Sequence, residues 1–164
     1  MKRVVIVRHG KAVPYGYDDD FNRDLRPRGK SDAALVSDEL MRRKIVPNIM
    51  ISSPAKRAIK TARIFADHLE FDRANIREVE DIYDGLTTRE FVEMIHELPA
   101  DAKTVFFFGH NPGFYYFVSN LLKDFRSDMP TTSTVGIDFD VDNWNNVEAR
   151  TGELAFHLVP RMFK

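Results

Sequence analysis

Three short runs of apolar residues stand out along the chain, and each leads directly into polar residues. The runs lie within residues 4–7, 48–51 and 104–109, and runs of this length predict strands buried on both faces, as in a parallel or mixed sheet covered by helices. The residues that follow or end them are Arg8-His9-Gly10, Ser52-Ser53-Pro54 and Gly109-His110. In open α/β sheets, ligands bind beyond the carboxyl ends of the strands. The pattern therefore predicts a binding site at this edge of the sheet.

Between these runs, apolar residues recur at the spacing of amphipathic helices. Four helices are predicted: over residues 29–44, from Pro54 through Leu69 with Ser53 as N-cap, from a Thr87/Glu90 capping box through Leu98, and from Asn111-Pro112 through Leu122.

The remaining strands are expected at residues 76–83, which include the exit from the strand, and in the tail. Strict alternation over residues 135–142 predicts a half-exposed strand, which forms a C-terminal edge hairpin with a last strand over residues 154–159. The predicted fold class is α/β, with three layers in which a mostly parallel mixed sheet is flanked by helices. No repeat or linker interrupts the chain, so we expect a single domain over residues 1–164.

A long polar loop, residues 11–28, follows the first predicted strand. Its acidic triplet, Asp18-Asp19-Asp20, raises the alternative of a metal-dependent phosphotransferase. Such carboxylates should directly end an apolar strand, whereas here they follow Tyr15-Gly16-Tyr17. We therefore interpret the triplet as part of a solvated loop.

Composition narrows the functional classes. The 164 residues include 24 Lys and Arg against 25 Asp and Glu, so the formal net charge of −1 gives no argument for binding nucleic acid or an anionic membrane. Cysteine is absent, which excludes disulfides, thiolate metal sites and a cysteine nucleophile. A cytoplasmic location is the expectation, since no signal-peptide pattern or membrane-spanning run is present.

The candidate chemistry lies at three strand ends. Arg8-His9 follows the first strand, Arg57 falls in the first turn of the helix after the second, and His110 follows the fourth. If these strands are parallel and adjacent, two arginines and two histidines converge. Such a cluster suits an oxyanion, most naturally a phosphoryl group, whose transfer is catalysed mainly by positioning and electrostatic stabilisation.

These motifs resemble the histidine phosphatase superfamily, whose fold is phosphoglycerate-mutase-like. The matching segments are Arg8-His9-Gly10, residues 53–58 (SPAKRA) and Gly109-His110. Within the superfamily the chain resembles the small SixA-type phosphohistidine phosphatases, on Arg23-Asp24-Leu25 with Arg28-Gly29 and on residues 109–113 (GHNPG).

The resemblance implies roles for particular residues. His9 would be the nucleophile that forms a transient phosphohistidine, and Arg8, Arg57, His110 and Arg23 would hold the phosphoryl oxygens. It implies no metal and no other cofactor. Many relatives carry a carboxylate acid after the third strand, where this chain has Glu80 and Asp81, and the spacing does not decide whether either reaches the site.

Three functions stay open at this stage. The first is a phosphohistidine phosphatase whose partner is a phosphorylated protein, a phosphohistidine carrier or a phosphorelay domain. The second is a metal-independent phosphatase of small phosphomonoesters. The third is a non-catalytic phosphate-binding module, against which the intact His9 and His110 argue, because binding alone does not require a nucleophile.

Overall fold

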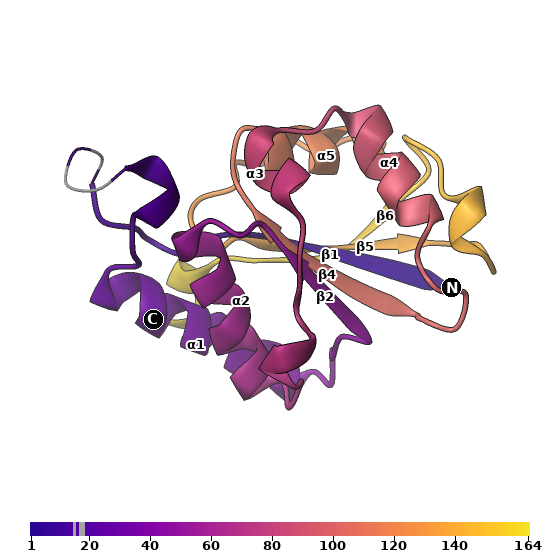
Figure 1. The fold of residues 1–164 in the computed structure, drawn as a ribbon. Helices are drawn as coiled ribbons and strands as arrows, with labels where there is room; N and C mark the ends of the chain where they lie inside the picture. Colours follow the sequence, from indigo (N-terminus) through magenta and orange to yellow (C-terminus); the bar gives the residue numbers. More distant parts are fainter. Residues whose placement is uncertain (15, 17–18) are drawn as a thin grey trace.

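A six-stranded sheet forms the centre of the protein in the computed structural model, which describes residues 1–14, 16 and 19–164 (Figure 1). The strands are β1 (Lys2–Arg8), β2 (Ile49–Ser52), β3 (Arg77–Glu78), β4 (Thr104–Gly109), β5 (Thr134–Phe139) and β6 (Glu153–Leu158). Their order is β3-β2-β4-β1-β5-β6; the first four are parallel, while β5 is antiparallel to both β1 and β6. The predicted mostly parallel mixed sheet with a C-terminal hairpin at its edge is confirmed.

Helices cover both faces of the sheet, which gives the predicted three layers (Figure 1). One face carries α1 (Pro27–Arg42) and α2 (Lys56–His68), and the other carries α3 (Glu80–Asp84), α4 (Thr88–His96) and α5 (Gly113–Leu121). Among the described helices, none is long and apolar enough to cross a membrane.

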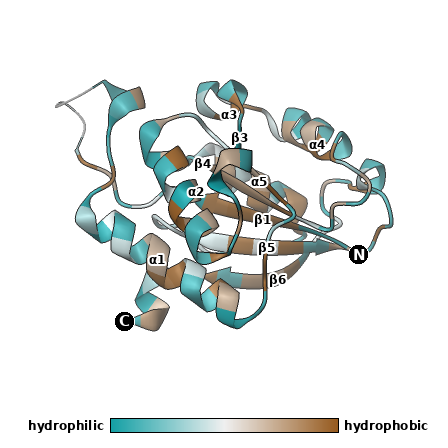
Figure 2. Cartoon of the chain, turned by 60° about the horizontal axis from the view of Figure 1, so that its bottom comes forward, coloured by the Kyte–Doolittle hydropathy of each residue, from teal (hydrophilic) through white to brown (hydrophobic). Residues whose placement is uncertain are grey.

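The apolar runs are continuous because successive side chains enter different layers. Val5 and Phe106 pack with the α1/α2 layer, whereas Ile6 and Phe107 pack with the α4/α5 layer, and all four are fully buried. Figure 2 shows the apolar residues gathered on the central strands and on the inward sides of the helices. Burying each large side chain contributes roughly 1.5–3 kcal/mol, so these strands anchor the fold.

The third predicted strand is wrong in extent. Only Arg77 and Glu78 form β3, at the exposed edge of the sheet, and residues 80–84 form helix α3 instead. Two acidic residues, Glu80 and Asp81, occupy the first turn of α3, where carboxylates interact favourably with the helix dipole. That preference and the short edge strand explain the difference.

Helix starts also differ from the sequence prediction. Helix α2 begins at Lys56 with Ala55 at the N-cap, so Ser53 and Pro54 precede the helix and Ser53 Oγ accepts from the backbone N–H of Ala55 at 3.1 Å. Helix α5 likewise begins at Gly113 after Pro112. The Thr87/Glu90 capping box of α4 is confirmed, with both reciprocal hydrogen bonds present.

The alternating tail forms a more buried strand than predicted. β5 lies between β1 and β6, and within it only Asp138 is partly exposed, where it forms an ion pair with Arg3 at 2.6 Å. Asp140 and Asp142, which complete the alternation, follow the strand instead of belonging to it.

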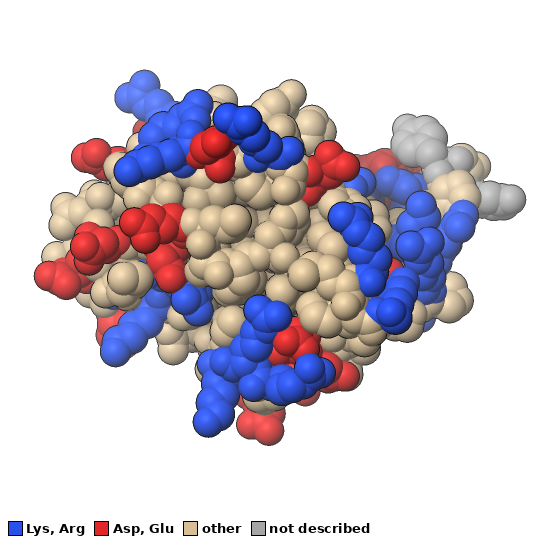
Figure 3. All heavy atoms as spheres, turned by 180° about the vertical axis from the view of Figure 1, so that it is seen from behind, with Lys and Arg blue, Asp and Glu red and all other residues tan. Residues whose placement is uncertain are grey.

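Charged side chains of both signs are interspersed over the face seen from behind. Lys and Arg lie there in separate groups with Asp and Glu near them (Figure 3). The described residues therefore form no single continuous basic surface on this face, in agreement with the net charge of −1.

Candidate active site

The sheet order places the three predicted strand ends side by side. β4 lies between β2 and β1, all three are parallel, and Arg8 pairs in register with Gly109. The chain stays paired just beyond the strands, because His9 N–H donates to Gly109 O at 3.0 Å and Ser53 N–H donates to Phe108 O at 2.9 Å. The predicted convergence of the strand ends is confirmed.

Glycine is required after His9 because two backbones meet there. A Cβ at Gly10 would lie 2.9 Å from the carbonyl oxygen of Gly29, and one at Gly29 would lie 2.2 Å from that of Lys11. The start of α1 is thus packed directly against the turn that follows β1. Close approach, rather than an unusual backbone angle, is the reason for Gly10.

His9 is buried and held in one orientation. The residue is 8% exposed, and Nδ1 lies 2.8 Å from Gly10 O, to which it donates. This assignment leaves the lone pair on Nε2. Burial, with the nearby cationic groups of Arg57 and Arg8, lowers the pKa of His9 to about 3 in spite of the hydrogen bond to Gly10. The imidazole is therefore neutral at physiological pH, as a nucleophile must be.

His110 lies next to His9 and is fixed by Ser53. The two imidazole centroids are 5.3 Å apart, and His110 Nε2 lies 2.7 Å from Ser53 Oγ. Ser53 Oγ accepts from Ala55 and still has its own proton to donate, so we assign the hydroxyl as donor to Nε2 and the His110 proton to Nδ1. Burial, followed by the charge of Arg57, lowers the pKa of His110 to about 4. This role of Ser53 was missed, because its position before Pro54 indicated a helix cap.

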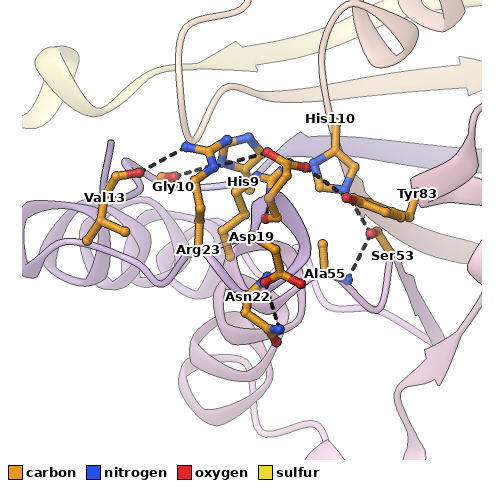
Figure 4. Close-up of polar contacts among 12 residues, drawn as sticks. His9, Gly10, Val13, Asp19, Asn22, Arg23, Ser53, Ala55, Tyr83 and His110 are labelled. Carbon is orange, nitrogen blue, oxygen red and sulfur yellow. Dashed lines mark hydrogen bonds and ion pairs between the residues drawn. The ribbon is translucent and has the colours of Figure 1, made fainter. Parts of the chain in front are cut away.

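The arginines approach from three directions. Arg57 is the second residue of α2 and is 5% exposed. Arg8 ends β1 and donates through Nη1 to Met129 O at 3.0 Å, while burial lowers its pKa. Arg23 comes from the loop after β1 and donates through Nη1 to Val13 O at 2.9 Å. Figure 4 shows Arg23 beside His9 and His110, so the predicted cationic cluster is assembled.

A carboxylate also lies in this cluster, and sequence reasoning misjudged it. Asp20 accepts from Arg23 Nε at 3.0 Å, from Arg57 Nη2 at 3.1 Å and from Tyr83 OH at 2.9 Å. The interpretation of the acidic triplet as a solvated loop is therefore wrong for Asp20. Asp19 caps the 3₁₀-helix η1 (Asp20–Asn22), and Asp18 lies outside the described residues.

Tyr83 was not identified from the sequence either. It belongs to α3, and its ring lies 5.7 Å from that of His110 and 5.2 Å from that of Phe21. A signal for Asp20 existed in its spacing of three residues from Arg23. The sequence held no such signal for Tyr83, because the position of Tyr83 depends on helix α3, and this segment was predicted to be a strand.

Glu80 and Asp81 both lie on the same short helix as Tyr83, and both are exposed. Among the described residues, no hydrogen bond or ion pair joins either side chain to His9, His110 or the arginines. Their possible role as an acid stays a prediction.

Several buried donors remain available at the site. Arg8 Nε, Arg57 Nε and His110 Nδ1 have no hydrogen-bond partner among the described residues. Buried N–H groups are normally satisfied, and a phosphoryl group offers three acceptor oxygens. No group of three or more His, Asp or Glu in the described part of the chain has the arrangement of a metal site.

The comparison with protein families agrees with this chemistry. The model of the histidine phosphatase superfamily (branch 1) matches residues 4–112, a range that holds both histidines and all three arginines. The chain belongs to the histidine phosphatase superfamily. With this family and this cluster of side chains, the protein is a phosphatase.

Individual relatives extend the likeness to nearly the whole chain. An uncharacterized chloroplastic protein of Arabidopsis thaliana is 27% identical over 162 residues, which cover 92% of this chain and 72% of the relative. The putative phosphohistidine phosphatase SixA from Agrobacterium tumefaciens has a TM-score of 0.82 at 22% identity, covering 97% of this chain and 98% of that one. The protein histidine phosphatase SixA complexed with tungstate has a TM-score of 0.83 at 21% identity, covering 99% of each chain. The phosphoglycerate-mutase-like fold predicted from the sequence is confirmed.

Proposed function

We propose that this superfamily member is a metal-independent phosphatase that removes phosphoryl groups from phosphorylated histidine on proteins. The observation that carries the proposal is a buried, neutral His9, oriented by Gly10 O, next to buried donors of Arg8, Arg57 and His110 that have no partner among the described residues. The likeness to two SixA structures named as phosphohistidine and protein histidine phosphatases supports the substrate class.

The reaction follows from these positions in two steps. The lone pair on His9 Nε2 attacks phosphorus, so an N–P bond forms while the bond between phosphorus and the substrate's histidine nitrogen breaks. The electron pair of the broken bond stays on the departing nitrogen, and the imidazole leaves as a neutral molecule because its other ring nitrogen carries a proton taken from solvent. Water then attacks phosphorus on His9, the enzyme N–P bond breaks, and inorganic phosphate is released.

The cationic side chains stabilise the charge on the phosphoryl oxygens during both steps. Arg57 Nε, Arg8 Nε and His110 Nδ1 would donate to these oxygens, and Arg23 would add a further positive charge at the loop side. Donors that are fixed in a buried site do not have to reorient during the reaction. They therefore stabilise the charge of the transition state more strongly than the same groups do in water.

The leaving group distinguishes this proposal from a phosphomonoester phosphatase. An alkoxide needs a proton from an acid as it leaves, whereas a phosphorylated imidazole can already carry a proton on its other ring nitrogen. The carboxylate that the structure places in the site, Asp20, has a lowered pKa and is ionised at neutral pH, so it is poorly suited to donate a proton. This favours an N–P over an O–P bond.

The partner in this proposal is a phosphorylated carrier or phosphorelay protein, and the location is cytoplasmic. A chain without cysteine fits a reducing compartment.

The decisive experiment compares kcat/KM on a phosphohistidine protein, a phosphoserine peptide and a panel of small phosphoesters. We expect the phosphohistidine protein to exceed every small phosphoester by at least about tenfold, or about 1.4 kcal/mol of transition-state stabilisation. A small phosphoester that is hydrolysed faster than every phosphohistidine protein tried would favour the metabolite phosphatase. Absence of turnover on all substrates, together with phosphate binding, would favour the binding module.

A further inference from the structure

Asp20 is bound by Arg23 and Arg57, which the proposed function assigns to the phosphoryl group, and by Tyr83. Its two carboxylate oxygens accept from Arg23 Nε, Arg57 Nη2 and Tyr83 OH, at 3.0, 3.1 and 2.9 Å. Its backbone carbonyl accepts from Arg57 Nη1 at 2.7 Å. Both terminal nitrogens of the buried Arg57 are therefore held by one residue of the loop.

The position of this carboxylate is close to where phosphorus must lie. Tyr83, which donates to Asp20, has its ring 5.7 Å from His110, and His110 is 5.3 Å from His9 (Figure 4). The negative charge of Asp20 also acts on His110, where it opposes the lowering of the His110 pKa by Arg57. A phosphoryl group on His9 would thus share its surroundings with Asp20.

Asp20 is present there as an anion. Partial burial tends to raise its pKa, but the hydrogen bond from Tyr83 and the charge of Arg57 outweigh this and leave the pKa below its ordinary value. An ionised carboxylate and a phosphoryl dianion repel each other, and both draw on the positive charge of Arg57 and Arg23. The two anions cannot both be fully bound by Arg23, Arg57 and Tyr83.

We propose, on the basis of the function proposed above, that Asp20 is a specificity-determining residue whose carboxylate competes with the incoming anion for Arg23, Arg57 and Tyr83. A free carboxylate offers the same charge and the same acceptor atoms as the Asp20 side chain. Because the chain holds Asp20 in place at a high effective concentration, a free carboxylate gains no binding energy by displacing it. A phosphoryl group carries more charge and a third oxygen. It also reaches the donors of Arg8 and His110 that Asp20 does not use. The competition therefore admits phosphoryl groups and rejects carboxylates.

The test is calorimetric binding of inorganic phosphate to the wild-type protein, Asp20→Asn and Asp20→Ala. Removing the internal anion should lower the Kd for phosphate at least about tenfold in both variants, and Asn keeps the size and one acceptor of the original side chain. Asp24→Asn is the matched control. It removes a carboxylate from the same loop that binds Lys56 and Lys60 instead of the site arginines, and it should leave the Kd unchanged.

The direction of the change separates the alternatives. If Asp20 instead holds the arginines in a binding-competent position, phosphate affinity falls in both variants and the proposal is overturned. Unchanged affinity overturns it as well. Far-ultraviolet circular dichroism of each variant establishes that the comparison is between folded proteins.

A second measurement uses acetate as an external carboxylate. In Asp20→Ala, acetate should occupy the vacated carboxylate position and weaken phosphate binding, whereas the wild-type protein should be insensitive to the same concentration. Equal sensitivity of the two proteins contradicts the proposal.

The binding measurements are independent of turnover, so the two proposals can fail separately. Wild-type protein that binds phosphate but does not hydrolyse phosphohistidine removes the proposed function, while tighter binding to Asp20→Asn still supports the competition. Conversely, full turnover with unchanged phosphate affinity in Asp20→Asn removes only the competition.

Discussion

The site has two halves that are built differently. His9, His110 and Arg57 belong to strand ends and a helix start that the core holds in place, and His9 and Arg57 are less than a tenth exposed. Arg23 and Asp20 belong to the loop between β1 and α1, and their side chains are 18% and 31% exposed. The first half has neutral histidines whose protons are placed by Gly10 and Ser53, whereas the second is an ion-pair cluster.

The difference shows how the two halves divide the work. Burial in the strand-end half keeps His9, the proposed nucleophile, neutral and holds it in one orientation, as attack on phosphorus requires. The loop half adjusts charge, because its partly exposed ion pairs can be exchanged for those of a ligand. Substitutions in the strand-end half should therefore affect kcat, and those in the loop half should mainly affect anion binding.

The largest effect is expected for His9→Ala. Removing Nε2 removes the atom that attacks phosphorus, so turnover should fall to the background, while inorganic phosphate should still bind because the arginines remain. Rapid-quench detection of an acid-labile phosphoenzyme in the wild-type protein and its absence in the variant checks the role directly. Near-wild-type kcat in His9→Ala would show that another group is the nucleophile.

Arg57→Ala should lower kcat/KM by about 10²-fold or more, the scale for removing one charge partner of the transition state. Lys60 lies three residues further along α2 and binds Asp24 at 2.9 Å, so Lys60→Ala should retain wild-type kinetics. Steady-state kinetics on one phosphohistidine protein compares the two. Similar losses would mean that α2 supplies general positive charge rather than a placed ligand.

Stability should depend on pH through the strand-end half. The pKa values of about 3 for His9 and about 4 for His110 lie below the ordinary histidine pKa of about 6.5. Between these folded values and about 6.5, the unfolded chain therefore binds more protons than the folded protein. The free energy of unfolding should be constant above pH 6.5 with respect to these groups and should decrease as the pH falls towards 4.

Urea unfolding of the wild-type protein, His9→Asn and His110→Asn between pH 4 and 7 measures this dependence. Each variant should show a shallower decline than the wild-type protein, since it lacks one of the two protonation sites. Parallel declines in all three would place the acid sensitivity elsewhere.

A smaller effect is expected at the exposed start of α3. Glu80→Gln and Asp81→Asn should change kcat/KM on a phosphohistidine protein by less than about twofold, the range of ordinary surface changes. If either residue is the acid, the loss should be clearly larger on a phosphoester, whose leaving oxygen needs a proton. Comparing the two substrates for each variant therefore settles the role that the sequence left open.

Chelation should have the smallest effect. Both halves supply positive charge through side chains, so activity should survive EDTA, and vanadate or tungstate should inhibit competitively. Loss of activity that a divalent metal restores would contradict a metal-independent mechanism.

Much of this arrangement is determined by local sequence. Consecutive apolar residues at 4–7 and 105–108 can be buried only in a sheet covered on both sides, because alternate side chains face opposite layers. Since parallel strands end at the same edge, residues that directly follow them, such as His9 and His110, could be placed together without coordinates. The capping box of α4 was also predictable, because its two partners lie three residues apart in the sequence.

Other features depend on contacts between segments far apart in the chain. The sequence indicated Ser53 only as a helix N-cap, and only the pairing of β2 with β4 brings it to His110, 57 residues away. Asp20 meets Tyr83 across 63 residues. No periodicity or spacing in the sequence indicates either contact. Without knowledge of its partners, a polar residue in a loop is interpreted as solvent-exposed. The sequence thus determined which cationic and imidazole side chains gather at the strand ends, and tertiary structure alone decided which anion already lies among them.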